Sequence, residues 1–211
     1  MPYLVLLGDS IFDNAAYVGG GPDVIAQVRP LLPAGWRATL LAVDGAVTTG
    51  VAAQLSRLPA DASHLVLSVG GNDALGHVGI LDQRASSSAQ VLGRLADAHE
   101  EFAVRYRRTV DAVLAHRLPT VVCTIYEGSF PDATMQRLAR TALMVFNDAI
   151  VRIAVERGVD LIDLRLLCDE TGDYANPIEP SVQGGGKIAR AIVTAVTETD
   201  PSRWHTRVHA G

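Results

Sequence analysis

Five short apolar runs alternate along this sequence with longer segments of helical periodicity. The apolar runs are residues 3–7, 38–43, 64–69, 120–125 and 159–162, and they are rich in leucine or β-branched side chains. Short runs that are apolar at nearly every position are typical of strands buried on both faces of a parallel sheet. The sequence therefore predicts five strands of this kind.

The segments between the runs have apolar residues at helical spacing. They are residues 22–32, 49–58, 87–116, 131–157 and 184–196. Alternating strands and helices imply right-handed crossovers and a parallel sheet covered by helices on both faces. We predict the α/β class, with a three-layer α/β/α sandwich around a flavodoxin-like five-stranded sheet of order 2-1-3-4-5. No composition shift marks a linker, so residues 1–211 are expected to form a single domain.

Composition narrows the possible partners and location. The net charge is -5 at pH 7 and no Lys/Arg-rich run compensates, which disfavours a nucleic-acid partner. The first apolar run ends at Gly8 and Asp9, too early for a signal peptide or a membrane span, so we expect a cytoplasmic protein with no membrane partner. Cys123 and Cys168 are expected to be reduced thiols, and we expect neither a metal site nor a cofactor.

Distinctive residues follow each of the first three predicted strands. Gly8-Asp9-Ser10 follows the first, Asp44-Gly45 the second, and Gly70-Gly71-Asn72-Asp73 the third. Ligands of open parallel sheets bind beyond the carboxyl ends of the strands, and the predicted strand order makes these three loops neighbours. A binding or catalytic site is therefore expected where the loops meet.

The residue types in these loops suit acyl transfer. A nucleophilic serine needs a sharp turn at a strand end, which Gly8-Asp9-Ser10 supplies. The oxyanion of the tetrahedral intermediate needs hydrogen-bond donors, for which the Gly45 N–H and the Asn72 amide are candidates. Each motif taken alone is more often a plain turn than a catalytic feature. Their joint placement favours Ser10 as a nucleophile.

These motifs also resemble those of a known family. The segment Leu7-Gly8-Asp9-Ser10 resembles the nucleophile block of SGNH (GDSL-type) hydrolases, Gly45 resembles their second block, and Gly70-Gly71-Asn72-Asp73 resembles their third. The resemblance implies the SGNH hydrolase fold, attack by Ser10 on an acyl carbonyl, and an oxyanion hole made by the Ser10 and Gly45 N–H groups and the Asn72 amide. It also implies hydrolysis of a small ester, thioester or other acyl substrate.

The fourth family block departs from the pattern. Family members have Asp-x-x-His-Pro followed by a glycine and a helix, whereas this chain has Asn176-x-x-Glu179-Pro180 before Gly184. Glu179 thus takes the position of the histidine and Asn176 that of the aspartate. A glutamate is a weak base unless burial raises its pKa. Two roles for Glu179 remain open: general base for Ser10, or a brace of its loop.

Two functions follow from these alternatives. One is a serine esterase or acylhydrolase with a modified base. The other is a catalytically impaired SGNH-like module that binds a small acyl or carboxylate ligand.

Further residues are candidates for substrate binding, and each has a structural alternative. They are Asp9, Asp13, Asp73, His77 and Tyr126. His77 follows the Asn72 block closely enough to overhang the pocket and act as an alternative base, although a surface position is favoured. Asp13 either bonds the Ser10 loop or caps a helix, and Tyr126 either lines the acyl pocket, donates a hydrogen bond or packs in the core.

Segments farther from the three loops complete the candidates. Residues 76–88 form a polar excursion that is a candidate lid or pocket wall. His205 and His209 belong to a tail that is a less favoured source of a base, and His64, His99 and His116 are expected to be structural or solvated.

Overall fold

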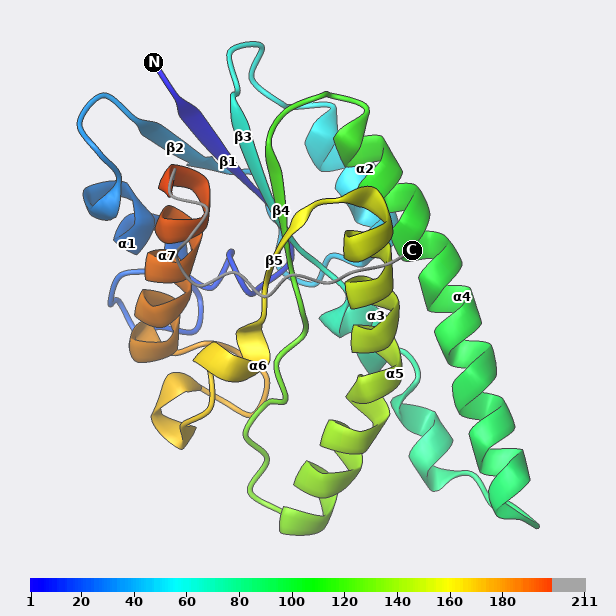
Figure 1. Cartoon of the computed structure of the whole chain (residues 1–211). Coiled ribbons are helices and arrows are strands. Elements are labelled where there is room, and N and C mark those ends of the chain that lie inside the picture. The colour runs from blue at the N-terminus through cyan, green and yellow to red at the C-terminus, as the bar shows by residue number, and fades with distance from the viewer. Residues whose placement is uncertain (199–211) are drawn as a thin grey trace.

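The computed structural model describes residues 1–198 and contains a five-stranded parallel sheet of order β2-β1-β3-β4-β5 (Figure 1). The strands are β1 (Tyr3–Gly8), β2 (Arg37–Leu40), β3 (His64–Ser68), β4 (Thr120–Cys123) and β5 (Asp160–Ile162). The predicted fold class and strand order are confirmed.

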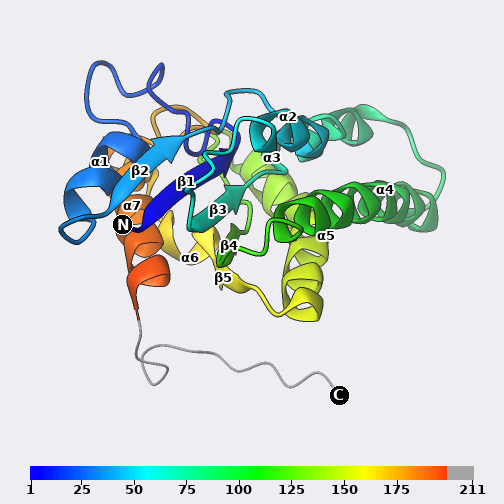
Figure 2. The same cartoon turned by 90° about the horizontal axis from the view of Figure 1, so that it is seen from above.

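Helices cover both faces of the sheet (Figure 2). One face carries α1 (Val24–Leu31) and α7 (Val182–Thr197), and the other carries α2 (Val51–Leu55), α4 (Ser88–Leu114) and α5 (Ala133–Arg157). The shorter elements are α3 (Gly71–Leu75), α6 (Leu164–Leu167) and the 3-10 turns η1 (Thr48–Gly50), η2 (Val78–Asp82) and η3 (Thr171–Asp173).

The strands are apolar throughout because both faces of the sheet are buried. In β1, Val5 and Leu7 belong to the core under α4 and α5, while Leu4 and Leu6 belong to the core under α1 and α7. All four side chains are fully buried. The absence of polar alternation in the sequence therefore reflects this three-layer packing.

The second strand is shorter than predicted. The sequence pattern extended it over residues 38–43, but regular pairing ends at Leu40. The N–H groups of Leu41 and Ala42 both donate to the carbonyl of Leu6, at 2.9 and 3.0 Å, which breaks the ladder. The chain nevertheless stays attached to β1, because the Val43 N–H donates to the Gly8 carbonyl at 3.1 Å.

Candidate functional site

Ser10 lies in a tight turn directly after β1. The preceding Gly8 has φ of +130°, and a Cβ at this position would lie 1.7 Å from the Ser68 carbonyl oxygen of β3. Only glycine fits there. The Asp9 N–H donates to the same carbonyl at 3.1 Å, and the Asp9 carbonyl accepts from the N–H groups of Phe12 and Asp13. The turn is thus fixed by backbone contacts, with the Ser10 side chain at its apex.

Gln54 holds the end of β1 from α2. Its side-chain amide donates to the Gly8 carbonyl at 2.7 Å, and its oxygen accepts from the Gly8 N–H at 2.8 Å. This residue was not predicted from the sequence. The available signal was a glutamine between Val51 and Leu55 on the apolar side of a short helix, where an amide needs polar partners.

The structure brings Ser10 and Glu179 together. The Ser10 hydroxyl donates to Glu179 Oε1 at 3.1 Å, and both residues are buried. Glu179 lies in the loop between η3 and α7, which is the segment that resembles the fourth family block. The other carboxyl oxygen, Oε2, is buried and has no hydrogen-bond partner among residues 1–198.

Asn176 shapes the loop rather than contacting the Glu179 carboxyl group. Its Oδ1 accepts from the backbone N–H groups of Ile178 and Glu179, at 3.0 Å each. This is an Asx-type turn that sets the backbone before Glu179. The residue at the position of the family aspartate therefore orients the loop backbone and not the Glu179 side chain.

Two more side chains fix the same loop. The Tyr126 hydroxyl donates to the Ile178 carbonyl at 2.6 Å, and the Asn14 amide donates to the Pro180 carbonyl at 3.1 Å. Asn14 also accepts from the Val24 N–H at 2.9 Å, so it joins the start of α1 to the loop. The carbonyls on either side of Glu179 are both held.

Burial shifts the ionisation of Glu179. Removal from water raises its pKa to about 7, with a smaller rise from the negative charge of Asp44, while the hydrogen bond from Ser10 opposes the shift. A carboxyl group with this pKa is a far better proton acceptor near neutral pH than an ordinary glutamate.

Asp9 is a second buried carboxyl group beside the site. Burial, with smaller contributions from the charges of Glu179 and Asp73, raises its pKa to about 7, against the hydrogen bond from the Ile11 N–H. That bond to Asp9 Oδ1 measures 3.1 Å. Asp9 lines the pocket next to Ser10, but it also stabilises the turn.

Each predicted oxyanion donor has an N–H hydrogen available for a ligand. Within the described part of the chain, the N–H groups of Ser10 and Gly45 make no hydrogen bond. The Asn72 amide donates one hydrogen to the Ala46 carbonyl at 3.0 Å, which orients it and leaves its second hydrogen free. Gly45 has φ of +75° in the turn after β2. The arrangement is compatible with an oxyanion hole.

A pocket opens at Ser10 and extends away from the sheet edge. Its volume is about 280 Å³, and its lining includes Ser10, Asp9, Asn72 and Glu179. His77 and Tyr126 line it as well. Residues 78–81 of the 76–88 excursion contribute Val78, Ile80 and Leu81, so this segment forms a wall of the pocket.

Asp13 and Asp73 do not line this pocket. Asp13 accepts from the Asp44 N–H at 2.9 Å, whereas Asp73 accepts from the Thr48 N–H at 2.9 Å and from its hydroxyl at 2.8 Å. Both carboxylates therefore hold the loop that carries Gly45, a positioning role that the sequence did not indicate.

Ser10 makes no hydrogen bond to a histidine among the described residues. His77 packs beside Phe146, and its Nε2 lies 4.0 Å from Glu101 Oε2. His99 Nε2 lies 3.5 Å from Asp148 Oδ2. His205 and His209 lie outside the described residues.

Cys123 and Cys168 are buried free thiols. A search of residues 1–198 for a helix long and apolar enough to cross a membrane found none.

A parallel sheet of this order, with the serine turn after its first strand and the glycine and asparagine loops after the next two, defines the SGNH class of hydrolase. The model of the GDSL-like Lipase/Acylhydrolase family matches residues 6–184, and the chain belongs to this family. Its members are ester-hydrolysing enzymes. A search of curated protein sequences found no significant match.

Solved structures share the fold at low sequence identity. An extracellular lipase from Streptomyces rimosus has a TM-score of 0.69 at 18% identity, covering 92% of this chain and 100% of the lipase. A phospholipase A1 from Streptomyces albidoflavus has a TM-score of 0.69 at 18% identity, over 92% and 99% of the two chains. The acetylxylan esterase Axe2 from Geobacillus stearothermophilus has a TM-score of 0.60 at 20% identity, over 93% and 94%.

Proposed function

We propose that the protein is a serine esterase or acylhydrolase in which Glu179 is the general base for Ser10. The observation that carries the proposal is the hydrogen bond from the Ser10 hydroxyl to Glu179 Oε1 at 3.1 Å. A base must lie within hydrogen-bond reach of the proton that it removes, and no histidine of the described chain does so.

The first half-reaction forms an acyl-enzyme. Glu179 takes the Ser10 hydroxyl proton as Oγ attacks the acyl carbonyl carbon. The carbonyl oxygen becomes an oxyanion, which the Ser10 and Gly45 N–H groups and the free Asn72 amide hydrogen stabilise. When the intermediate collapses, the bond to the alcohol oxygen breaks and Glu179 returns its proton to that oxygen.

The second half-reaction repeats these steps with water. Glu179 removes a proton from water, the resulting hydroxide attacks the acyl carbon, and the proton returns to Ser10 Oγ as the carboxylic acid leaves.

The protein compensates in two ways for the missing histidine and its aspartate. Burial raises the Glu179 pKa to about 7, which matches the base to neutral pH. Orientation comes from the loop backbone, through Asn176, Tyr126 and Asn14, rather than from a carboxylate bonded to the base.

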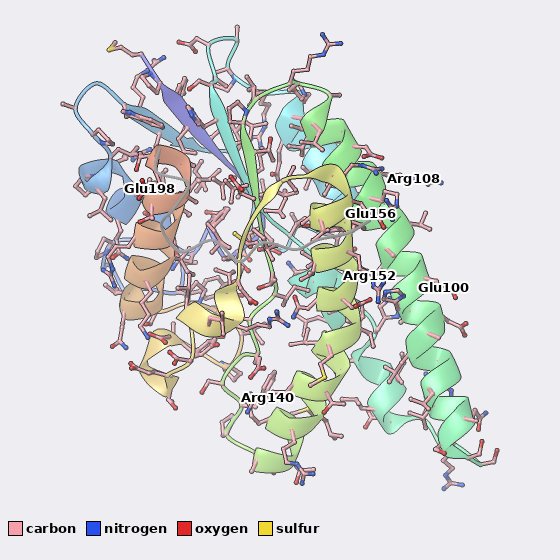
Figure 3. All side chains as sticks on the ribbon, viewed as in Figure 1. Glu100, Arg108, Arg140, Arg152, Glu156 and Glu198 are labelled. Atoms are coloured by element: carbon pink, nitrogen blue, oxygen red, sulfur yellow. The ribbon has the colours of Figure 1, made fainter. Side chains whose placement is uncertain are left out.

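Turnover of p-nitrophenyl acetate and butyrate tests the proposal. Ser10→Ala should reduce the rate to background, and Glu179→Gln should lower kcat by roughly a hundredfold or more, the typical contribution of a general base. Glu100→Gln is the matched control, because Glu100 is an exposed residue of α4 (Figure 3). Full activity of folded Glu179→Gln would assign Glu179 a bracing role, and absence of Ser10-dependent turnover would favour the ligand-binding alternative.

A further inference from the structure

The pocket at Ser10 is lined mainly by apolar side chains, and its polar lining residues away from the nucleophile turn include His77 and Glu127. Its hydrogen-bonding groups near the nucleophile are Asp9, Ser10, Asn72 and Glu179, at the carboxyl edge of the sheet. Residues of η2, α4 and α5 form the rest of the lining. Helices α4 and α5 pack against one another on one face of the sheet (Figure 1). The side chains contributed by these two helices are apolar: Leu95, Ala98, Ala139, Ala142, Leu143 and Phe146 are among them.

Small side chains keep this space open. Ala139 and Ala142 on α5, and Ala98 on α4, line the pocket, while larger residues of the same helices fill the core around it. A methyl group at these positions leaves room that a longer side chain would occupy. The space is therefore a consequence of particular residues at an otherwise well-packed helix pair.

A hydrocarbon chain is the ligand that such a wall recognises. A sugar or another polyol would lose its hydrogen bonds to water on entering this part of the pocket and find few polar partners there. An apolar chain gains the free energy of leaving water. His77, on the same lining, is partly exposed and packs its ring beside Phe146, so it does not make the wall strongly polar.

The volume sets the size of the occupant. An engineered cavity of about 150 Å³ binds benzene, a six-carbon ligand. A pocket of about 280 Å³ therefore accommodates a chain of roughly ten carbons.

We propose that this pocket binds the acyl chain of the substrate, a linear chain of roughly eight to twelve carbons, with Ala139 and Ala142 setting its length. The inference rests on the proposed acylhydrolase function and replaces the small acyl group expected from the sequence. The acyl half is assigned here because it stays attached to Ser10 between the two half-reactions. The alcohol must leave after taking a proton from Glu179, so we assign it to the side of the site that is open to solvent.

The chain-length profile of kcat/KM is the first test, measured with p-nitrophenyl esters from acetate to tetradecanoate. Each methylene that enters the pocket should raise kcat/KM about fourfold, equivalent to about 0.8 kcal/mol. The rise should level off near roughly ten carbons, where the pocket ends. A profile that falls steadily from acetate would overturn the proposal.

Variants of the wall locate the chain. Ala142→Phe and Ala139→Phe should each lower the ratio of decanoate to acetate turnover by at least about tenfold, because the ring fills the space. Ala96→Phe, the same change at an exposed position of α4, should leave the ratio unchanged. Leu143→Ala should shift the preference toward longer chains, and it keeps the test decisive if a phenylalanine variant fails to fold. An unchanged ratio in all folded wall variants would contradict the assignment.

Binding without catalysis separates this inference from the proposed function. Decanoate should bind the Ser10→Ala protein more tightly than acetate in calorimetry, and Ala142→Phe in that background should abolish the difference. If decanoate binds in this way but no ester is hydrolysed, the assignment of the pocket to a hydrocarbon chain is supported and the enzymatic proposal fails. If acetate esters are hydrolysed but decanoate neither binds nor is preferred, the function stands and the pocket assignment fails. Faster turnover along a series of acetate esters of longer alcohols, with no acyl preference, would assign the pocket to the alcohol instead.

Discussion

Ser10 and Glu179 are 169 residues apart in the chain and are joined by a hydrogen bond of 3.1 Å. The contact links the turn after β1 to the loop before α7, so the two outer segments of the family match meet at one edge of the sheet. Because Glu179 is buried, its carboxyl group has a pKa of about 7 and is well matched to the serine that it contacts.

The pH dependence of kcat/KM should reveal the base. Glu179 accepts a proton only when ionised, so activity should be low at pH 5, rise with pH through about 7 and level off above it. The expected midpoint lies well above the range of an ordinary glutamate. A profile of p-nitrophenyl butyrate hydrolysis from pH 5 to 9 checks this. The Glu179→Gln variant should not show the rise in activity through pH 7. A profile that is flat over this range would mean that an ordinary solvated carboxylate, ionised throughout, controls the rate.

Introducing the aspartate and histidine of the family at positions 176 and 179 should test whether residue 179 lies beside Ser10 and whether residue 176 can orient it. Glu179→His alone places an imidazole beside Ser10 without a carboxylate to orient it. Adding Asn176→Asp supplies that carboxylate and still offers an acceptor to the Ile178 and Glu179 backbone N–H groups. Loss of the orienting aspartate costs about ten-thousandfold in the serine-protease triad, so the double variant should greatly exceed the single one in kcat. Equal, negligible activity of both folded variants would show that residue 179 is not delivered to Ser10.

Stability should fall with rising pH because of Asp9. Its pKa is about 7 in the folded protein and ordinarily 3.8, so the folded state holds a proton that the unfolded state releases. The stabilisation is fully present below pH 4, declines as the pH rises, and is lost above about 7. Asp9→Asn keeps an acceptor for the Ile11 N–H and should reduce this decline, leaving the part that comes from the raised pKa of Glu179. Urea unfolding at pH 5 and pH 8 measures the difference; the same decline in both proteins would contradict the assignment.

Tyr126 should act through the position of the base. Tyr126→Phe removes the hydrogen bond to the Ile178 carbonyl, next to Glu179, and should lower kcat several-fold with little change in KM. Thr120→Val is a matched control, since it loses a 2.8 Å hydrogen bond to the Leu118 carbonyl at the start of β4, away from the site. Each variant should lose roughly 1 kcal/mol of stability. Equal kcat values in the two variants would remove Tyr126 from the catalytic account.

The fold was predictable because its dominant signal is local. Apolar runs and helical periodicity each lie within one segment, and the order of the strands follows from the alternation. The end of β2 was not predictable, because it depends on both Leu41 and Ala42 donating to one carbonyl of a neighbouring strand. Residue patterns alone do not encode that contact.

The site residues that belong to sequence motifs could be predicted. Those that depend on tertiary packing could not. Pro180 and Gly184 align the loop that places Glu179 beside Ser10, but Gln54 and Asn14 make contacts that sequence spacing does not reveal. The wall formed by residues 76–88 and Tyr126 was predicted, but the apolar wall of α4 and α5 was missed because its residues come from segments far apart in the chain. Alanines such as Ala139 and Ala142 also look like ordinary helix residues until the facing surface is known.

Covalent labelling of Ser10 tests most directly whether Glu179 activates it. An alkyl phosphonate with a p-nitrophenol leaving group should add once to the protein, at Ser10, with a rate that rises through pH 7 when followed by intact-mass spectrometry. Glu179→Gln should label at least about a hundredfold more slowly and without that rise, because general-base assistance is lost. Labelling of folded Glu179→Gln at the rate and pH dependence of the unmodified protein would contradict the account.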